Sequence, residues 1–349
     1  MSNVELAVDR DYVVNTLIDL VRINSLNPSL VPGAPGEAEI AAYLVEALRP
    51  LGLDVAAHEI KPGRVNVVGR LEGAGHGRSL LLNGHMDTVG IEGMENPFSA
   101  DIRDGKLHGR GAFAMKGSLA AMMGAVKALV DAGVGLEGDL LITAVADEEY
   151  ASIGTEDIVK HYKADGAIVT EPTDMAICRA HRGYIWYDVE TVGRAAHGSR
   201  YTEGIDAIMR MGRFLAELDR LEQELRARPP HPLAGPPSLH ASMIKGGAEP
   251  SIYAAHCSLK VERRIVAGET EAQATSELQT IIDRLAAADP TFKATVKPVF
   301  QREPFEIGAD APIVRALEQA ATRRLGRPPA HIGQTFWTDA ALLAGAGME

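Results

Sequence analysis

Hydrophobic positions in the first half of the chain follow two alternating patterns. Apolar residues recur at helical spacing in three segments, 9–23, 37–51 and 116–132. Between the helices lie short, nearly continuous apolar runs at 64–71, 79–85, 139–149 and 165–172. Such runs are typical of strands buried on both faces of a sheet. The alternation predicts an α/β fold with a mixed, largely parallel sheet flanked by helices.

The pattern changes near residue 178. Residues 181–194 alternate apolar and polar side chains, as a half-exposed antiparallel strand does. The elements that follow give the order β-α-β-β-α-β, which predicts an inserted α+β ferredoxin-like domain at 178–300. A helix at 311–325 then returns the chain to the first domain. We therefore expect a discontinuous domain of residues 1–177 and 301–349.

Composition and charge narrow the class of protein. A chain of 349 residues suits two domains, and its net charge of −12 argues against nucleic acid or an anionic membrane as main partner. The N-terminus lacks a basic segment followed by an apolar core, and no run of 18 apolar residues predicts a membrane span. The two cysteines, Cys178 and Cys257, suit a reducing compartment. We expect a cytoplasmic protein.

Three of the buried strands are followed by residues that bind metals. The second run ends in His85, with Asp87 two residues on; the third ends in Asp147–Glu149, and the fourth reaches Glu171. Sites in open α/β sheets form outside the carboxyl ends of strands. So many acids at one edge repel one another unless cations hold them. The sequence therefore predicts a metal site.

Chemistry suggests a role for each residue of this site. His85 would bind a metal through a ring nitrogen, and Asp87 would orient that ring. Glu149 and Glu171 would be carboxylate ligands. Glu148 points to the other side of an extended backbone, which makes it the candidate general base that takes a proton from water.

Several motifs extend this pattern over the whole chain. They are GHMDTV, GRGAFAMKG at 109–117, DEE, TEPT, HRG at 181–183, GRAAHGS at 193–199, GGAEPSIY at 246–253, ERRIVAGE at 262–269 and FWTDAALLA at 336–344. The set resembles the zinc-dependent amidohydrolase and peptidase family of acetylornithine deacetylase, succinyl-diaminopimelate desuccinylase and glutamate carboxypeptidase. The last segments favour the branch similar to acetylornithine deacetylase.

The resemblance implies a function and further site residues. It implies hydrolysis of an N-acyl amino acid or small peptide by two zinc ions per subunit, with cobalt as an alternative metal. It implies a homodimer formed through the inserted domain, which serves as dimerisation and lid domain. His197 matches a histidine that reaches the partner subunit's active site and stabilises the oxyanion. Arg264 matches an arginine that holds the substrate carboxylate.

The chain departs from the family pattern at two places. Ala114 stands where the family has an aspartate that bridges both metals, and a methyl group cannot bind a cation. The family continues beyond the position of Glu349 with another strand and a histidine ligand, so we expect a truncated C-terminus. The chain as written is predicted to bind metal poorly and to be nearly inactive. An engineered change, a natural pseudoenzyme and an incomplete chain all fit these departures.

Three other functions compete with the deacylase as interpretations of the sequence. A non-catalytic protein that binds a carboxylated small molecule is favoured by Ala114, but the retained Glu148 speaks against it. A carboxypeptidase or dipeptidase of the same family is a second alternative. A cofactor-binding oxidoreductase is disfavoured, because GRGAFAMKG has the spacing of neither a dinucleotide-binding loop nor a P-loop.

Overall fold

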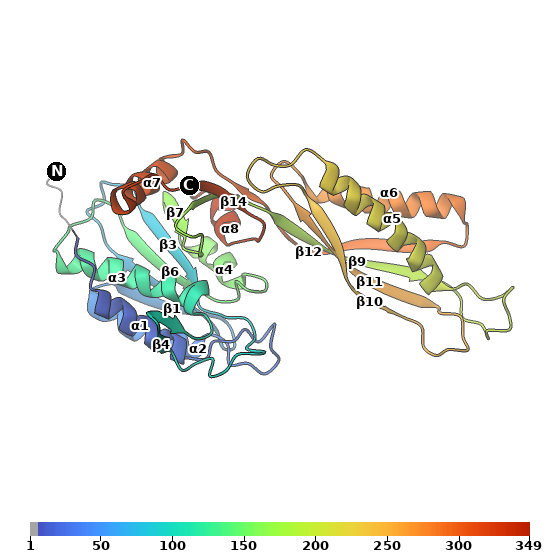
Figure 1. Ribbon diagram of the computed structural model, residues 1–349, viewed down its shortest axis with the longest axis horizontal. Helices are drawn as coiled ribbons and strands as arrows, with labels where there is room; N and C mark the ends of the chain where they lie inside the picture. The colour runs from blue at the N-terminus through green and yellow to red at the C-terminus, as the bar shows by residue number, and fades with distance from the viewer. Residues whose placement is uncertain (1–5) are drawn as a thin grey trace. The chain divides into compact units, whose positions relative to one another are not determined.

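A computed structural model describes residues 6–349 and divides the chain into two compact units (Figure 1). The first unit runs up to Met175 and also contains Asp310–Pro329 and Thr338–Glu349. The second contains Ala176–Ala309 and Ala330–Trp337. The chain thus passes between the units repeatedly, and each unit is built from segments far apart in sequence.

The first unit is centred on a five-stranded mixed sheet of order β1-β2-β6-β3-β7. Strand β2 is antiparallel to both of its neighbours, whereas β6, β3 and β7 pair in parallel. The predicted mixed sheet is confirmed, with parallel pairing confined to β6, β3 and β7. Its strands are β1 (Asp54–Lys61), β2 (Arg64–Leu71), β3 (Leu80–His85), β6 (Leu140–Val145) and β7 (Gly166–Val169).

Helices cover both faces of this sheet. Helices α1, α2 and α3 share a core with one face, and α4 and α8 pack on the other. Helix α7 lies beside the start of β7, where Ile313 packs against Gly166. The helical elements are α1 (Arg10–Arg22), α2 (Ala38–Leu48), η1 (Arg49–Leu51), η2 (Ala112–Lys116), α3 (Gly117–Asp131), α4 (Ile153–His161), α7 (Pro312–Leu325) and α8 (Ala340–Gly345).

The continuous apolar runs follow from burial on both faces. Successive side chains of a strand point to opposite faces. In β6, Ile142 belongs to the core beneath α1, α2 and α3, whereas its neighbour Leu141 belongs to the core beneath α4 and α8. In β2, Val67 and Val68 divide in the same way. Apolar residues therefore occur at successive positions of such a strand, and the strict alternation seen in half-exposed strands is absent.

One helical segment of this unit, Ala112–Asp131, is both long and apolar. By length and composition it is apolar enough to cross a membrane. In the structure it is part of the core, because Leu119, Met123 and Val126 are buried between α1, α2 and the sheet. Burial in the protein interior accounts for its apolar composition.

The second unit contains a four-stranded antiparallel sheet of order β10-β11-β9-β12. Helices α5 and α6 pack on one face, where Phe214 and Leu278 join the core of the sheet. This is the β-α-β-β-α-β arrangement that the sequence predicts. Its elements are β9 (Gly183–Val192), α5 (Ala207–Ala227), β10 (Ser238–Gly246), β11 (His256–Ile265), α6 (Glu271–Ala288) and β12 (Lys293–Arg302).

A second, three-stranded sheet corrects the predicted domain boundaries. It has the order β13-β8-β14, from β8 (Ile177–His181), β13 (Phe305–Glu306) and β14 (His331–Gln334). The sequence assigned 301–309 and 330–337 to the first domain. Both belong to the second unit, because β13 and β14 pair with β8 on either side. This pairing joins strands distant in sequence, so local patterns could not reveal it.

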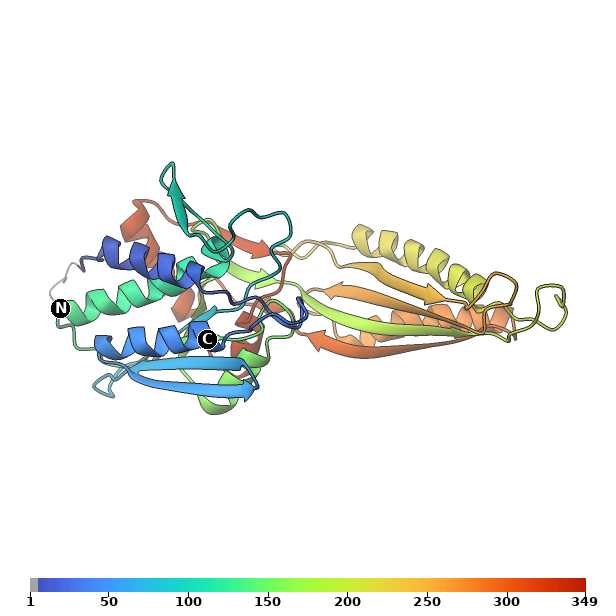
Figure 2. The same cartoon turned by 90° about the horizontal axis from the view of Figure 1, so that it is seen from below.

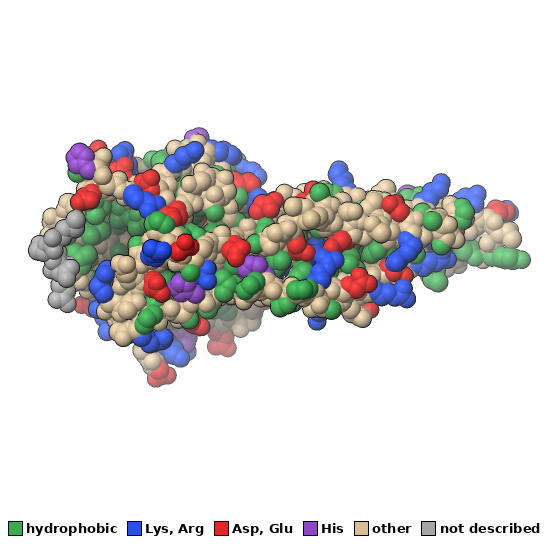
Figure 3. Space-filling view, turned by 90° about the horizontal axis from the view of Figure 1, so that it is seen from above, with side chains coloured by type: hydrophobic (Ala, Val, Ile, Leu, Met, Phe, Trp, Pro, Cys, Tyr) green, Lys and Arg blue, Asp and Glu red, His purple; other side chains and the backbone are tan. Residues whose placement is uncertain are grey.

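The surface carries charges of both signs. Acidic and basic side chains are interspersed over the face shown in Figure 3, although acids predominate in the whole chain. A short hairpin of β4 (Asp101–Arg103) and β5 (Lys106–His108) stands out from the first unit and is coloured teal in Figure 2. It directly precedes the segment that carries Ala114.

Candidate metal centre

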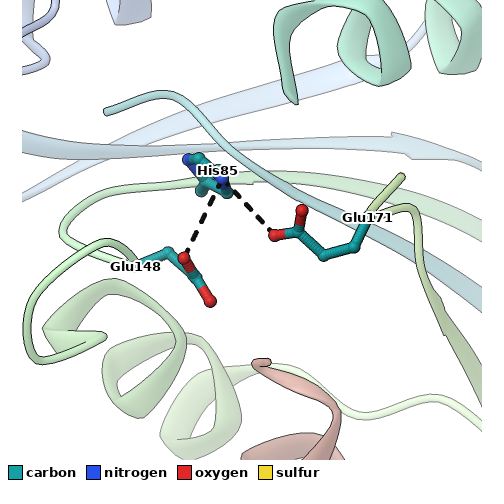
Figure 4. Close-up of side chains that lie close together, drawn as sticks. All are labelled: His85, Glu148 and Glu171. Atoms are coloured by element: carbon teal, nitrogen blue, oxygen red, sulfur yellow. Dashed lines mark ion pairs between the residues drawn. The ribbon is translucent and has the colours of Figure 1, made fainter. Parts of the chain in front are cut away.

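Three side chains with metal-binding atoms meet at the carboxyl ends of adjacent parallel strands. His85 is the last residue of β3, Glu148 follows β6 and Glu171 follows β7. Their ligand atoms all lie within 4.8 Å of one another. His85 Nε2 is 3.4 Å from Glu171 Oε1 and 3.9 Å from Glu148 Oε2 (Figure 4). Because β3 lies between β6 and β7, its final residue is flanked by acids from both neighbours.

A hydrogen bond orients the imidazole of His85. Its Nδ1 lies 2.8 Å from the main-chain carbonyl oxygen of Asp87, which can only accept. In the neutral ring the proton is therefore on Nδ1, and Nε2 faces the two glutamates with a free lone pair. The carboxylate of Asp87 is more distant, with Oδ1 3.5 Å from Nδ1. Asp87 thus orients the ring chiefly through its main chain.

The carboxylate of Asp87 holds the turn that carries the other acids. Its Oδ1 accepts the N–H of Glu148 at 3.0 Å, and its Oδ2 accepts the N–H of Glu149 at 3.1 Å. The side-chain amide of Asn27 also donates to Oδ2, at 2.8 Å. These bonds explain why a fully buried acid keeps its charge: burial raises the pKa of Asp87, but His85 and these donors outweigh it and lower the pKa.

A bound cation would stabilise the buried carboxylates of the cluster. Burial, together with the charges of Glu171 and Asp339, raises the pKa of Glu148 well above its usual range. Burial also raises the pKa of Glu149. For His85, burial lowers the pKa, but Asp87 and Glu171 outweigh it and the pKa is raised well above its usual value. One imidazole and two carboxylates at ligand distance are a donor set that fits a divalent transition metal.

The structure groups the predicted acids differently from the sequence interpretation. Glu148, expected to be the base, lies in the cluster with His85 and Glu171. Among residues 6–349, these three form the group of His, Cys, Asp or Glu side chains whose ligand atoms are close enough together to hold a metal ion. Glu149, expected to be a ligand, is half-buried, and its side chain lies outside that group. Both are adjacent on a turn rather than on an extended strand. The alternation of an extended backbone therefore does not apply to them.

Ala114 lies on the turn η2, next to the histidine strand. The sulfur of the adjacent Met115 lies 3.1 Å from the main-chain nitrogen of His85. Lys116 fastens the same turn to the end of α1, because its Nζ donates to the carbonyl of Ile23 at 2.8 Å. Ala114 itself is half-buried. The turn thus adjoins the cluster, and its side chain at position 114 offers no ligand atom.

His197 and Arg264 belong to the second unit. His197 is exposed, and its Nδ1 lies 2.8 Å from the hydroxyl of Ser199. Arg264, on β11, donates from Nε to Glu262 at 2.6 Å, and its guanidinium stacks over the ring of Tyr184 at 5.0 Å. The arginine is thus held by neighbours of its own sheet.

Sequence reasoning missed one buried acid beside the cluster. Asp339 directly precedes α8, and its Oδ2 accepts from Asn83 at 3.1 Å and from Thr155 at 2.7 Å. Burial raises the pKa of Asp339 to about 6, and its charge contributes to the raised pKa of Glu148. The polar Asn83 within an apolar run was the available signal, because a buried amide needs partners.

The chain is similar in sequence to a known protein family and to several of its characterised relatives. The family model described as "Peptidase family M20/M25/M40" matches residues 81–348. The chain is 30% identical over 304 residues to N-formyl-4-amino-5-aminomethyl-2-methylpyrimidine deformylase of Bacillus subtilis, covering 82% of this chain and 71% of the relative. It is also 30% identical over 344 residues to acetylornithine deacetylase of Myxococcus xanthus, covering 96% and 86%.

Solved structures share the fold. The YXEP protein of Bacillus subtilis, described as a dinuclear metal binding peptidase from the M20 family, aligns with a TM-score of 0.72 at 15% identity. The alignment covers 97% of this chain and 87% of that one. At this identity the match concerns the fold alone.

Proposed function

Because the chain belongs to peptidase family M20/M25/M40, a family of metallohydrolases, we propose that its chemistry is hydrolysis of the amide bond of a small N-acylated amine. An N-acyl amino acid is the favoured substrate class, since relatives include an acetylornithine deacetylase and a deformylase that each remove a small acyl group. The observation that carries the proposal is the group of His85, Glu148 and Glu171 at the strand ends.

The donor set defines how a metal would be held. His85 and Glu171 would bind one divalent ion and Glu149 would bind a second, so that the carboxylate of Glu148 stays free to accept a proton. We propose zinc, with cobalt as the alternative, and two ions per subunit, as the resemblance to the zinc-dependent family implies. When bound, such an ion polarises the substrate carbonyl and makes a water molecule more acidic.

The side chains of this chain supply the remaining steps. Glu148, in this proposal, takes a proton from the attacking water as its oxygen bonds to the amide carbon. The carbon–nitrogen bond then breaks, and Glu148 returns the proton to the departing amine, leaving a carboxylic acid and a neutral amine, between which the acid proton then passes to give a carboxylate and an ammonium ion. His197 of the partner subunit in a homodimer would donate to the carbonyl oxygen as negative charge develops on it. Arg264 would bind the substrate carboxylate.

Ala114 limits this chemistry. An aspartate on turn η2 would add a carboxylate beside His85, whose negative charge would help to hold divalent ions there. A methyl group supplies neither charge nor lone pair. We therefore propose that the chain as written binds metal weakly and hydrolyses amides slowly, and that Ala114→Asp restores both.

The test compares Ala114→Asp with the parent chain and with Phe113→Asp. Phe113 is 72% exposed on the same turn, so Phe113→Asp adds an equal charge that points to solvent. We expect Ala114→Asp alone to gain tightly bound Zn²⁺, measured by elemental analysis, and to hydrolyse members of a panel of N-formyl and N-acetyl amino acids. An Ala114→Asp chain that binds Zn²⁺ but hydrolyses no member of the panel would contradict the deacylase proposal.

Two other functions are kept as alternatives. Ala114 favours a non-catalytic protein that binds a carboxylated small molecule through Arg264. A carboxypeptidase or dipeptidase activity is compatible with the same cluster. Calorimetric binding of N-acetyl amino acids without turnover in Ala114→Asp would favour the first, and cleavage of dipeptides in preference to N-acyl amino acids would favour the second.

A further inference from the structure

A buried polar network lies directly behind the metal centre. Five of its side chains come from four separate segments of the first unit and are almost fully inaccessible to solvent: Asn27, Glu37, Arg64, Asp87 and Asp147. Three of them are acids and one is an arginine. Buried charges of this density are stable only when each is paired and hydrogen-bonded.

Arg64, at the start of β2, is the cation of this network. Its Nε and Nη2 donate to the two carboxylate oxygens of Glu37 at 2.7 and 2.8 Å. Nη2 also donates to Asp147 Oδ1 at 2.8 Å. Glu37 in turn accepts the main-chain N–H of Asp147 at 3.2 Å. Arg64 and Glu37 therefore hold both the side chain and the backbone of Asp147.

Asn27 connects this arginine network to the metal centre. Its Nδ2 donates to Asp87 Oδ2 at 2.8 Å and to Asp147 Oδ1 at 3.1 Å, so one amide group separates two carboxylates. Its Oδ1 accepts from Arg64 Nη2 at 3.3 Å. The main-chain N–H of Asn27 donates to the carbonyl of Thr88 at 2.9 Å, which fixes the amide beside the histidine strand.

The turn that carries the two glutamates depends on these contacts. Asp147 has a φ of +68°, in the left-handed region that residues other than glycine rarely occupy. Such a conformation persists where surrounding contacts hold it in place. The next two residues, Glu148 and Glu149, donate their N–H groups to Asp87. The backbone of the turn is thus held from both ends by Asp147 and Asp87.

We propose that Asn27 and Arg64 are positioning residues of the metal centre. Arg64 fixes Asp147, Asn27 ties Asp147 to Asp87, and the two aspartates present Glu148 to His85 and Glu171. The inference rests on the proposed function, because it assigns the network to metal binding. The competing explanation is that the network only stabilises the fold.

The test measures metal affinity and stability separately. The reference is the chain of 349 residues carrying Ala114→Asp, into which Asn27→Ala or Arg64→Lys is introduced. Arg64→Lys keeps the charge but loses the planar fork that reaches Glu37 and Asp147 together. The matched control is Val126→Ala, a fully buried apolar position on α3 that destabilises the same unit without touching the network.

Each variant is titrated with Co²⁺, and the visible absorption of the bound ion is recorded on protein shown to be folded by circular dichroism. We expect the Kd for Co²⁺ to rise about 10-fold or more in both network variants, as for residues behind metal ligands elsewhere. We also expect the absorption bands at saturation to change, because the turn that carries Glu148 and Glu149 moves. Val126→Ala should keep the reference Kd and spectrum.

The outcomes separate this inference from the proposed function. A reference chain that binds no Co²⁺ overturns the proposed metal centre and the inference with it. A reference chain that binds Co²⁺, with unchanged Kd and spectrum in the network variants, overturns the inference alone. Equal losses of affinity in Val126→Ala and the network variants would also overturn it. If Asn27→Ala does not fold, Arg64→Lys decides between these outcomes.

Discussion

At the scale of single residues, the least expected charge outside the cluster is Lys116. It is 1% exposed on turn η2, and its Nζ donates to the carbonyl of Ile23. Burial lowers the pKa of its amine to about 7, from 10.5 for the unperturbed group. The turn beside the metal centre is therefore anchored by an amine that loses its charge near neutral pH.

This shift predicts how stability depends on pH. Between about 7 and 10.5 the unfolded chain holds the Lys116 proton and the folded chain does not, so this residue makes stability rise with pH. In metal-free protein, the free energy of unfolding should increase by about 2 kcal/mol more between pH 7.5 and 9 in the parent chain than in Lys116→Met. Urea unfolding at both pH values measures this difference. Parallel pH profiles of the two chains would contradict it.

At the scale of elements, strand β10 stands out in the second unit. It forms one edge of the four-stranded sheet, and nearly all of its residues are exposed. Met243 is 69% exposed and Ile244 is 55% exposed. A long edge strand with exposed apolar side chains favours pairing with another chain. This supports the proposed homodimer, in which β10 of each subunit would pair with its counterpart.

Lysine substitutions on the edge strand β10 test the proposed dimer. We expect the double change Met243→Lys and Ile244→Lys to shift the protein from dimer to monomer in sedimentation velocity, because like charges would face each other across the pairing. The control is Ile102→Lys, which places one lysine on a comparably exposed position of the β4–β5 hairpin in the first unit. A parent chain that sediments as a monomer would remove the proposed role of His197 in the partner's site.

At the scale of the whole molecule, the two units have separate hydrophobic cores. One core joins α5 and α6 to the antiparallel sheet, and the others lie on the two faces of the mixed sheet. Because no side chain is shared between these cores among the residues described, each unit can be destabilised by itself.

Amide hydrogen exchange should show that the two units open independently of each other. Phe214→Ala empties a fully buried position of the second unit and should cost it about 3–5 kcal/mol. We expect amide exchange to accelerate in β9 and β11 but to stay unchanged in β3 and β6. Leu44→Ala, in the core of the first unit, should produce the reverse pattern. Acceleration of both units by either change would show that they unfold together.

The sequence by itself determined the fold class and the identity of the chemical groups. Apolar runs identified β2, β3, β6 and β7 because burial on both faces leaves a local signature in each strand. Because sites form at the carboxyl ends of strands, the sequence predicted that His85, Glu148 and Glu171 belong to one site. The motifs indicated the family, because each motif is a short stretch of sequence that can be recognised without the fold.

Tertiary structure alone decided what depends on residues distant in sequence. The structure places Glu148 inside the cluster and the side chain of Glu149 outside it. The reason is that Asp147 has a left-handed backbone conformation and turns the chain where the sequence predicted an extended strand. The structure brought Asp339 and Arg64 to the site because buried charges must find partners wherever the fold places them. It also moved 301–309 and 330–337 into the second unit, since pairing between strands is a contact that no local pattern records.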